Sequence, residues 1–260
     1  MPLALTREVS AALAACQLTH LERVQIDVER ARAQHAAYEQ ALRHAGCTVE
    51  RLPATADMPD SVFIEDIAVV FDELAVVTRP GAESRRGEVP VVAEALGRHR
   101  SVRTIQPPGT IDGGDVLVVG RRVFIGRSTR TNADAIDQMR RLLTPFGYTV
   151  WEARLRGCLH LKSAVTALGE DVLLANRTWL DESPFADFDV LSVDPAEQMA
   201  ANALRVGDRV IYPTAFPRTA ERLAARGFHL ELVGASELAK AEGAVTCCSL
   251  IIETAETWDG

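Results

Sequence analysis

The chain has 260 residues, of which 47% are hydrophobic and 25% charged, a composition that suits a folded protein with a large core. Its net charge of -8 at pH 7 opposes binding to a phosphate backbone, so we expect no nucleic acid partner, whereas a small cation would be attracted. No apolar run approaches the ~20 residues of a membrane span, and we expect no membrane association.

The N-terminal segment MPLALTREVSAALAAC carries an early Arg and Glu and has no long apolar stretch, so we expect no signal peptide. The five cysteines fit neither a disulfide framework nor paired CxxC zinc motifs: Cys16, Cys47, Cys158, Cys247 and Cys248. Reduced thiols in the cytoplasm fit this usage best. We therefore predict a cytoplasmic protein without a metal site.

In chain order, residues 3–9 come first and look like the second strand of a hairpin that lacks its first strand. An amphipathic segment at residues 27–46 then predicts a helix.

Four stretches then repeat one pattern, in which an apolar strand, a tight turn and a second apolar strand follow one another. They cover residues 65–81, 114–131, 162–178 and 201–217. Each has a short polar or Gly-containing break between two β-rich runs, which is typical of a hairpin. Helices are predicted after three of them, within residues 88–99, 131–147 and 219–227. Alignment of Asp66, Asp115, Ser163 and Asn202 gives steps of 49, 48 and 39 residues.

Residues 247–253, CCSLIIE, look like the first strand of a fifth unit that has no second strand. This half-unit complements the half-unit at the N-terminus. We therefore predict a five-unit α/β ring, closed by pairing residues 3–7 with residues 249–253 in one sheet. The alternative is an ordinary α/β sandwich with a coincidental rhythm. Because no linker-like segment interrupts the pattern, residues 1–260 are predicted to form a single domain.

Polar residues occupy the starts of the predicted strands. They are Glu65, Asp66, Asp112, Asp115, His160, Lys162, Ser163, Asn202, Cys247 and Ser249. Any one of them is more commonly a hydrogen-bonded turn residue. Carboxylates, a histidine and a cysteine that converge on one axis are better explained as a site.

Cys247 and His160 are candidates for a nucleophile and its proton donor, since a reactive thiolate needs such a neighbour. A buried packing cysteine and a structural histidine are the alternatives, and spacing leaves both open. Adjacent residues of a strand point to opposite faces, which places Cys247 with Ser249 towards the axis and Cys248 in the core. The Gly pair of TIDGGDV marks either a close backbone approach or a bulge.

Five ordered motifs, SVFIEDIAVV, TIDGGDVLVVG, RSTRTN, GCLHLKS and EGAVTCCSLII, resemble those of the dimethylarginine dimethylaminohydrolase family. The resemblance runs from about residue 1 to about residue 253. It implies the pentein fold, a five-bladed α/β propeller. It also implies a cofactor-free hydrolase that converts Nω-methylated arginine to citrulline and methylamine or dimethylamine through a covalent Cys-thiouronium intermediate.

The resemblance assigns roles to individual residues. Cys247 would be the nucleophile, His160 the general acid and base, and Asp112 the carboxylate beside the histidine. The implied substrate-binding residues are Leu18, Asp60, Glu65, Asp66, Arg85, Arg130 and Ala241. Among them, Asp66 would hold the substrate guanidinium and the two arginines its α-carboxylate.

Three alternatives remain at this point. An arginine or agmatine deiminase would use the same residues with a different leaving group. Arginine deiminases of this superfamily usually carry an inserted helical bundle, for which 260 residues leave no room, and an amidinotransferase is disfavoured by size in the same way. A non-catalytic pentein would lack the Cys–His–acid set. The expected partner is a small guanidinium substrate, and we consider a homodimer.

Overall fold

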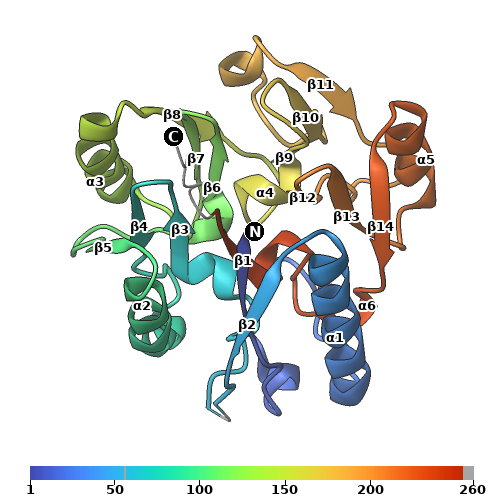
Figure 1. The fold of residues 1–260 in the computed structure, drawn as a ribbon, viewed down its shortest axis with the longest axis horizontal. Coiled ribbons are helices and arrows are strands. Elements are labelled where there is room, and N and C mark those ends of the chain that lie inside the picture. Colours follow the sequence, from blue (N-terminus) through green and yellow to red (C-terminus); the bar gives the residue numbers. More distant parts are fainter. Residues whose placement is uncertain (56, 254–260) are drawn as a thin grey trace.

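The computed structural model describes residues 1–55 and 57–253 and arranges them as five small sheets, each with three strands (Figure 1). The first sheet has the order β15 (Ser249–Ile252), β1 (Leu3–Arg7), β2 (Thr48–Leu52). The others are β3 (Ala68–Val70), β4 (Leu74–Val77), β5 (Ser101–Thr104); β6 (Val116–Val119), β7 (Arg122–Arg127), β8 (Thr149–Arg154); β9 (Val165–Ala167), β10 (Val172–Ala175), β11 (Asp189–Ser192); and β12 (Leu204–Val206), β13 (Arg209–Pro213), β14 (His229–Val233).

Every sheet has the same internal plan. The first two strands pair antiparallel, and the third runs parallel to the middle strand. A parallel pair needs a crossover. In four sheets a helix makes it: α1 (Val28–His44), α2 (Val89–Gly97), α3 (Ala133–Leu143) and α5 (Pro217–Ala225). A 3-10 turn at Ser183–Phe185 stands in its place in the fourth sheet.

The third strands were missed by the sequence pattern, which predicted only strand, strand and helix. Their residues are mostly exposed or half-exposed, and polar residues interrupt them, as in TVERL (48–52) and SVRT (101–104), so they lack the apolar run that identifies the other strands. A strand at the edge of a sheet is stabilised by its backbone hydrogen bonds to the neighbouring strand, and these leave no mark in the sequence.

The two ends of the described chain meet in the first sheet. Strand β1 pairs antiparallel with β15, with Leu3 opposite Ile252 and Thr6 opposite Ser249, and it pairs parallel with β2. The helices α1, α2, α3 and α5 lie on the outside of the arrangement, while β1, β3, β6 and β9 lie towards its middle (Figure 1).

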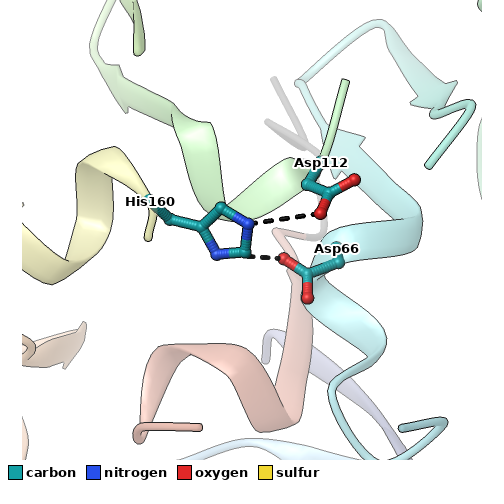
Figure 2. A group of neighbouring side chains, drawn as sticks. All are labelled: Asp66, Asp112 and His160. Carbon is teal, nitrogen blue, oxygen red and sulfur yellow. Dashed lines mark hydrogen bonds and ion pairs between the residues drawn. The ribbon is translucent and has the colours of Figure 1, made fainter. Parts of the chain in front are cut away.

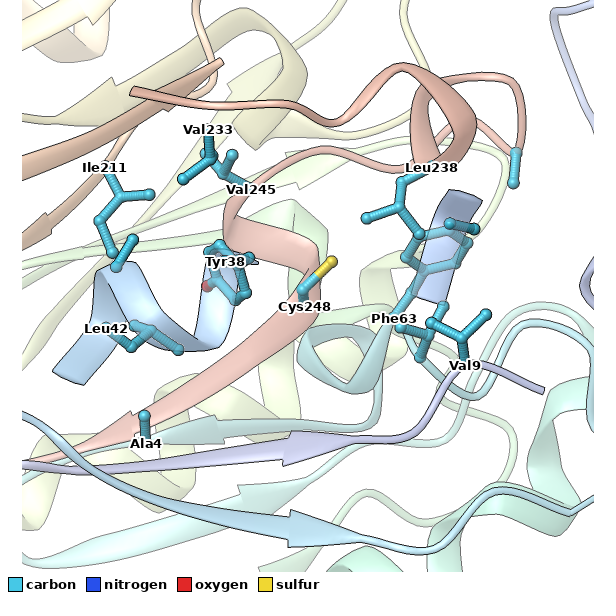
Figure 3. Packing of buried hydrophobic residues seen from close by; sticks show 14 of the residues in the cluster. Ala4, Val9, Tyr38, Leu42, Phe63, Ile211, Val233, Leu238, Val245 and Cys248 are labelled. Carbon is cyan, nitrogen blue, oxygen red and sulfur yellow. The ribbon is translucent and has the colours of Figure 1, made fainter. Parts of the chain in front are cut away.

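Apolar clusters fill the space between the helices and the sheets. One of them joins Ala4 of β1, Leu42 of α1 and Ile211 of β13 to Cys248 near the C-terminus (Figure 3). Burial of such side chains contributes roughly 25 cal/mol per Å² of apolar surface. The N-terminal strand and the segment around Cys248 therefore share one core.

Two long helices begin where their capping residues predict. Asp27 accepts a hydrogen bond from Arg30 N at the start of α1, and Asn132 accepts one from Ala135 N at the start of α3. The remaining short helices are α4 (Leu161–Ala164) and α6 (Ser236–Ala239). Among residues 1–55 and 57–253, no helix combines the length and apolar character that crossing a membrane requires.

Candidate active site

A short helical turn leads into several of the inner strands. Ile64–Ile67 precedes β3, Gly113–Asp115 precedes β6, α4 precedes β9, and Thr246–Cys248 precedes β15. The polar residues predicted at strand starts therefore lie mostly on turns. Both Cys247 and Cys248 belong to such a turn and precede the strand. The prediction that they lie on a strand, from which their opposite directions were argued, was therefore wrong.

Hydrogen bonds connect these turns in order and return to the first one. They run from Gly114 N to Asp66 Oδ1, Leu161 N to Asp115 Oδ1, Asn202 Nδ2 to Lys162 O, Thr246 N to Asn202 Oδ1, and Thr246 Oγ1 to Glu65 Oε2. Each bond joins two different units of the repeat, and every side chain involved is buried or half-buried. The turns are thus fixed against one another, which gives the side chains that they carry defined positions.

A small pocket collects most of the residues that the sequence singled out. Its volume is about 30 Å³, and eight of the ten predicted site residues line it: Asp60, Asp66, Arg85, Asp112, Arg130, His160, Ala241 and Cys247. Gln17, Phe63, Leu159, Glu242 and Gly243 complete the lining. The other two predicted residues, Leu18 and Glu65, lie beside it.

His160 lies between two carboxylates (Figure 2). Its Nε2 is 3.2 Å from Asp112 Oδ2, and its Nδ1 is 3.8 Å from Asp66 Oδ1. Burial disfavours the imidazolium, but the Asp66 charge and the Asp112 hydrogen bond outweigh it and raise the pKa of His160 to about 9. The histidine is therefore protonated at neutral pH and can donate a proton.

Backbone groups hold both carboxylates in place. Asp112 Oδ1 accepts a hydrogen bond from Gly81 N at 2.9 Å, and Asp66 Oδ1 accepts one from Gly114 N at 3.1 Å. A Cβ atom on Gly114 would lie 2.6 Å from His160 Nδ1. Of the two explanations for the Gly pair, the structure supports a close backbone approach.

The two adjacent cysteines have different surroundings. Cys247 is half-buried and lines the pocket, whereas Cys248 is 1% exposed and packs into the core cluster of Figure 3. Burial, followed by the nearby Glu65 and Asp66 carboxylates, raises the pKa of the Cys247 thiol. Without a cationic substrate in the pocket, this thiol is therefore protonated at neutral pH.

Arg85 is buried and already has many partners. Its Nε and Nη2 donate to the Glu88 carboxylate at 3.0 and 2.9 Å, and its Nη1 donates to Asp66 Oδ2 at 2.5 Å. The backbone carbonyls of Asp60 and Phe63 also accept from Nη2. Since a guanidinium has five N–H groups, one N–H of Nη1 remains for a substrate in this arrangement. Bidentate binding of a substrate carboxylate by Arg85 would require it to give up one of its present hydrogen bonds.

Arg130 is half-buried, and its Nη2 donates to Thr19 Oγ1 at 3.0 Å. Asp60 accepts the backbone N–H of Gln17 with both carboxylate oxygens, at 3.1 and 3.2 Å. Burial raises the pKa of Asp60 to about 6. Leu18, which follows Gln17, packs against the apolar cluster and does not line the pocket.

Glu65 faces a second, larger cavity of about 730 Å³ bordered by the inner strands β3, β6, β9, β12 and β15. Its carboxylate accepts hydrogen bonds from Lys162 Nζ at 2.6 Å and Thr246 Oγ1 at 2.8 Å. Burial raises the pKa of Glu65, although Lys162 counteracts this effect. The structure thus places Glu65 next to the pocket and engages it with protein partners.

Sequence reasoning did not single out several pocket residues. Four of them lie within the motifs quoted above: Phe63, Leu159, Glu242 and Gly243. Their closeness in sequence to the predicted site residues is the one signal that could have identified them. Gly243 fits because a Cβ there would come within 2.0 Å of the Phe63 ring. Gln17 has no comparable signal, because only the fold brings it to the pocket.

Asp66, Asp112 and His160 offer one ligand atom each within 4.8 Å of one another, a set that a metal ion could bind. The charge on His160 opposes this use, since an imidazolium has no free lone pair for a metal. The same arrangement, with a cationic acid next to a thiol and carboxylates, suits nucleophilic attack on a planar cation followed by protonation of its leaving group.

Comparison with known proteins identifies a matching family profile and similar sequences. A family profile described as "N,N dimethylarginine dimethylhydrolase, eukaryotic" matches residues 4–185. The N(G),N(G)-dimethylarginine dimethylaminohydrolase of Streptomyces coelicolor is 44% identical over 250 residues, which cover 95% of this chain and 95% of the relative. The enzyme of the same name from Pseudomonas aeruginosa is 39% identical over 226 residues, covering 86% of this chain and 89% of the relative.

Solved structures agree with these matches. A variant of the Pseudomonas aeruginosa enzyme in complex with citrulline superposes with a TM-score of 0.91 at 36% identity, covering 96% of this chain and 98% of that chain. The N-terminal domain of a cyanobacterial arginine dihydrolase has a TM-score of 0.88 at 21% identity, covering 97% of both chains, which shows a shared fold.

Proposed function

The chain belongs to the dimethylarginine dimethylaminohydrolase family, and we propose that this pocket hydrolyses Nω-methylated L-arginine to L-citrulline and methylamine or dimethylamine. The observation that supports this most is the position of His160 between two buried carboxylates, in the same pocket as Cys247. The family assignment decides against a non-catalytic protein.

We assign substrate binding to the charged residues of the pocket. Asp66 has acceptor positions beyond those used by Gly114 and Arg85, and these suit the N–H groups of a guanidinium. The half-buried Arg130 suits the α-carboxylate, and Arg85 adds its remaining N–H. Asp60 suits the α-amino group. Leu18, Glu65 and Ala241 remain proposed contacts.

In the first step, the substrate cation lowers the pKa of the Cys247 thiol, which loses its proton to solvent. The thiolate attacks the guanidinium carbon and forms a C–S bond. His160 gives its proton to the methylated nitrogen, the C–N bond breaks, and the amine leaves. A cationic thiouronium on Cys247 and a neutral His160 remain.

In the second step, His160 takes a proton from water, and the resulting hydroxide attacks the thiouronium carbon. The C–S bond then breaks and returns the thiolate, and the product loses one proton to become neutral citrulline. Asp112 acts by holding the imidazole and stabilising its charge. Because the cation has been consumed, Cys247 regains its proton when the product leaves.

We also infer that the five units close into a ring and form a single domain. The pairing of β1 with β15 and the series of hydrogen bonds that returns from Thr246 to Glu65 support this inference. A cytoplasmic location and a homodimer stay predictions. Sedimentation of the purified protein tests the homodimer.

The proposed function is tested by incubating the purified enzyme with dimethylarginine, monomethylarginine, arginine and agmatine. We expect citrulline and dimethylamine in equal amounts from dimethylarginine, measured by mass spectrometry. Ammonia release from arginine at a higher kcat/KM would instead make the protein a deiminase.

Matched cysteine variants give the control. Cys247→Ser should abolish citrulline formation while the protein stays folded, because a hydroxyl is a far weaker nucleophile than a thiolate. Cys248→Ser should keep its activity and lose about 1 kcal/mol of stability, because it buries a hydroxyl in the core. An active Cys247→Ser with an inactive Cys248→Ser would overturn the assignment.

A further inference from the structure

The pocket is too small for its proposed substrate. Its volume of about 30 Å³ has room for roughly two water molecules. A methylated arginine can therefore enter only if part of the wall moves. Gln17 lines the pocket and has an exposed side chain, and Thr19, His20 and Leu21, which follow it closely in the chain, are exposed as well. Residues 17–21 are here called the flap.

One side chain holds most of the flap. The Glu242 carboxylate accepts hydrogen bonds from the backbone N–H groups of Thr19, His20 and Leu21, at 2.9, 2.5 and 2.7 Å. Hydrogen bonds to a charged acceptor are roughly twice as strong as those between neutral groups. These three bonds span more than 220 residues of sequence, from the flap to the segment that carries Cys247.

The backbone of Glu242 is strained. Its φ of 59° lies in the left-handed region, and Glu242 is the only residue other than glycine with a positive φ in the described chain, residues 1–55 and 57–253. Glycine adopts this conformation without cost, and a side chain does not. A glutamate at such a position indicates that its carboxylate has a use that outweighs the strain.

The flap also touches two residues to which we assign substrate binding. Gln17 N donates to Asp60, and Thr19 Oγ1 accepts from Arg130. Opening the flap would free the side chains of Asp60 and Arg130. Closing it over a substrate would shield their contacts with that substrate from water. The Glu242 carboxylate is hydrogen-bonded to the backbone of this same flap.

We propose that Glu242 is a positioning residue that latches the flap over the bound substrate and so determines how tightly the enzyme holds it. The proposal rests on the proposed function for its kinetic consequence. Its structural consequence, protection of the flap backbone, is independent of any substrate.

The test uses two variants of the full-length enzyme. Glu242→Gln keeps the shape of the side chain but removes its charge and one acceptor oxygen. Glu242→Gly removes the latch and also relieves the strain. We expect KM for dimethylarginine to rise about 10-fold in Glu242→Gln and about 100-fold in Glu242→Gly, with kcat within about 3-fold. A tenfold change corresponds to about 1.4 kcal/mol, which is the size of one net hydrogen bond.

Hydrogen exchange of the flap amides is the second measurement. In both variants, the amides of Thr19, His20 and Leu21 should exchange at least about 10-fold faster, while the melting temperature of Glu242→Gly does not fall, since the flap opens locally. Glu22→Gln is the control, because Glu22 adjoins the flap and has no partner among the described residues. It should change neither KM nor exchange.

The outcomes separate the two proposals. Unchanged flap exchange in Glu242→Gly would overturn the latch, whatever the activity. A fall in kcat with an unchanged KM would also overturn it, because the residue would then act on the chemical step. If the wild-type enzyme fails to hydrolyse methylated arginine while exchange at the flap responds as expected, the proposed function is wrong and the latch stands.

Discussion

His160 owes its charge to the residues around it. Two carboxylates face its two ring nitrogens, and they more than offset the cost of burying an imidazolium. This charge serves both steps of the proposed reaction, since a histidine that is already protonated can act as the acid without first collecting a proton. It also ties the stability of the fold to pH.

The pKa of His160 is about 9 in the folded protein and about 6.5 in an unfolded chain. A raised pKa stabilises the folded state fully below the unfolded value, and this contribution disappears as pH rises through 9. We predict that the difference in free energy of unfolding between wild type and His160→Gln shrinks between pH 6.5 and 9. Urea unfolding from pH 6 to 10 measures it, and a difference that stays constant or grows with pH contradicts the prediction.

At the scale of the element, short turns position the proposed catalytic groups. The turn Gly113–Asp115 brings its backbone against Asp66 and His160, and only glycine leaves room there. A carboxylate on one turn can then accept a backbone N–H from the next. The turn therefore sets the distance between an acid and its histidine.

We predict that Gly114→Ala lowers kcat at least about 10-fold without unfolding the protein, since one misplaced group can cost that much. The added Cβ would lie 2.6 Å from His160 Nδ1 and 2.8 Å from Asp66 Oδ1, so one of the two must shift. Gly97→Ala is the control, because no heavy atom lies within 4 Å of a Cβ at that helix position. Steady-state kinetics and circular dichroism measure both variants. Equal activity of the two variants would show that the backbone at Gly114 lies less close to His160 and Asp66 than the structure indicates.

At the scale of the whole molecule, the fold depends on contact between the first and last strands of the described residues, β1 and β15. Leu5 of β1 lies opposite Leu250 of β15, and both side chains belong to one buried cluster. Because paired residues of antiparallel strands point to the same side, these side chains pack against each other. The N-terminal strand is thereby the middle strand of a sheet that the C-terminal strand completes.

We predict that Leu5→Ala costs about 2–5 kcal/mol of stability, as expected for a fully buried leucine. Combined with Leu250→Ala, the two effects should be non-additive by at least about 0.5 kcal/mol, because the residues touch. A double-mutant cycle measured by urea unfolding provides the coupling energy. Strict additivity would argue that the terminal strands are not packed together in solution.

The sequence by itself determined the repeat, the hairpins and the chemistry-bearing residue types. Alternation of apolar runs with tight turns is a local property, so the first two strands of each unit and the helices α1, α2, α3 and α5 could be predicted. The complementary half-units at residues 3–7 and 249–253 likewise indicated a shared sheet, and β1 does pair with β15.

Only the tertiary structure decided the rest, since it depends on contacts between residues far apart in the chain. The third strand of each sheet exists through backbone pairing, which has no side-chain signature. The charge on His160 requires Asp66 and Asp112 to meet it from two other units. Glu242 illustrates the limit best, because the three backbone groups that it binds lie more than 220 residues away in the chain.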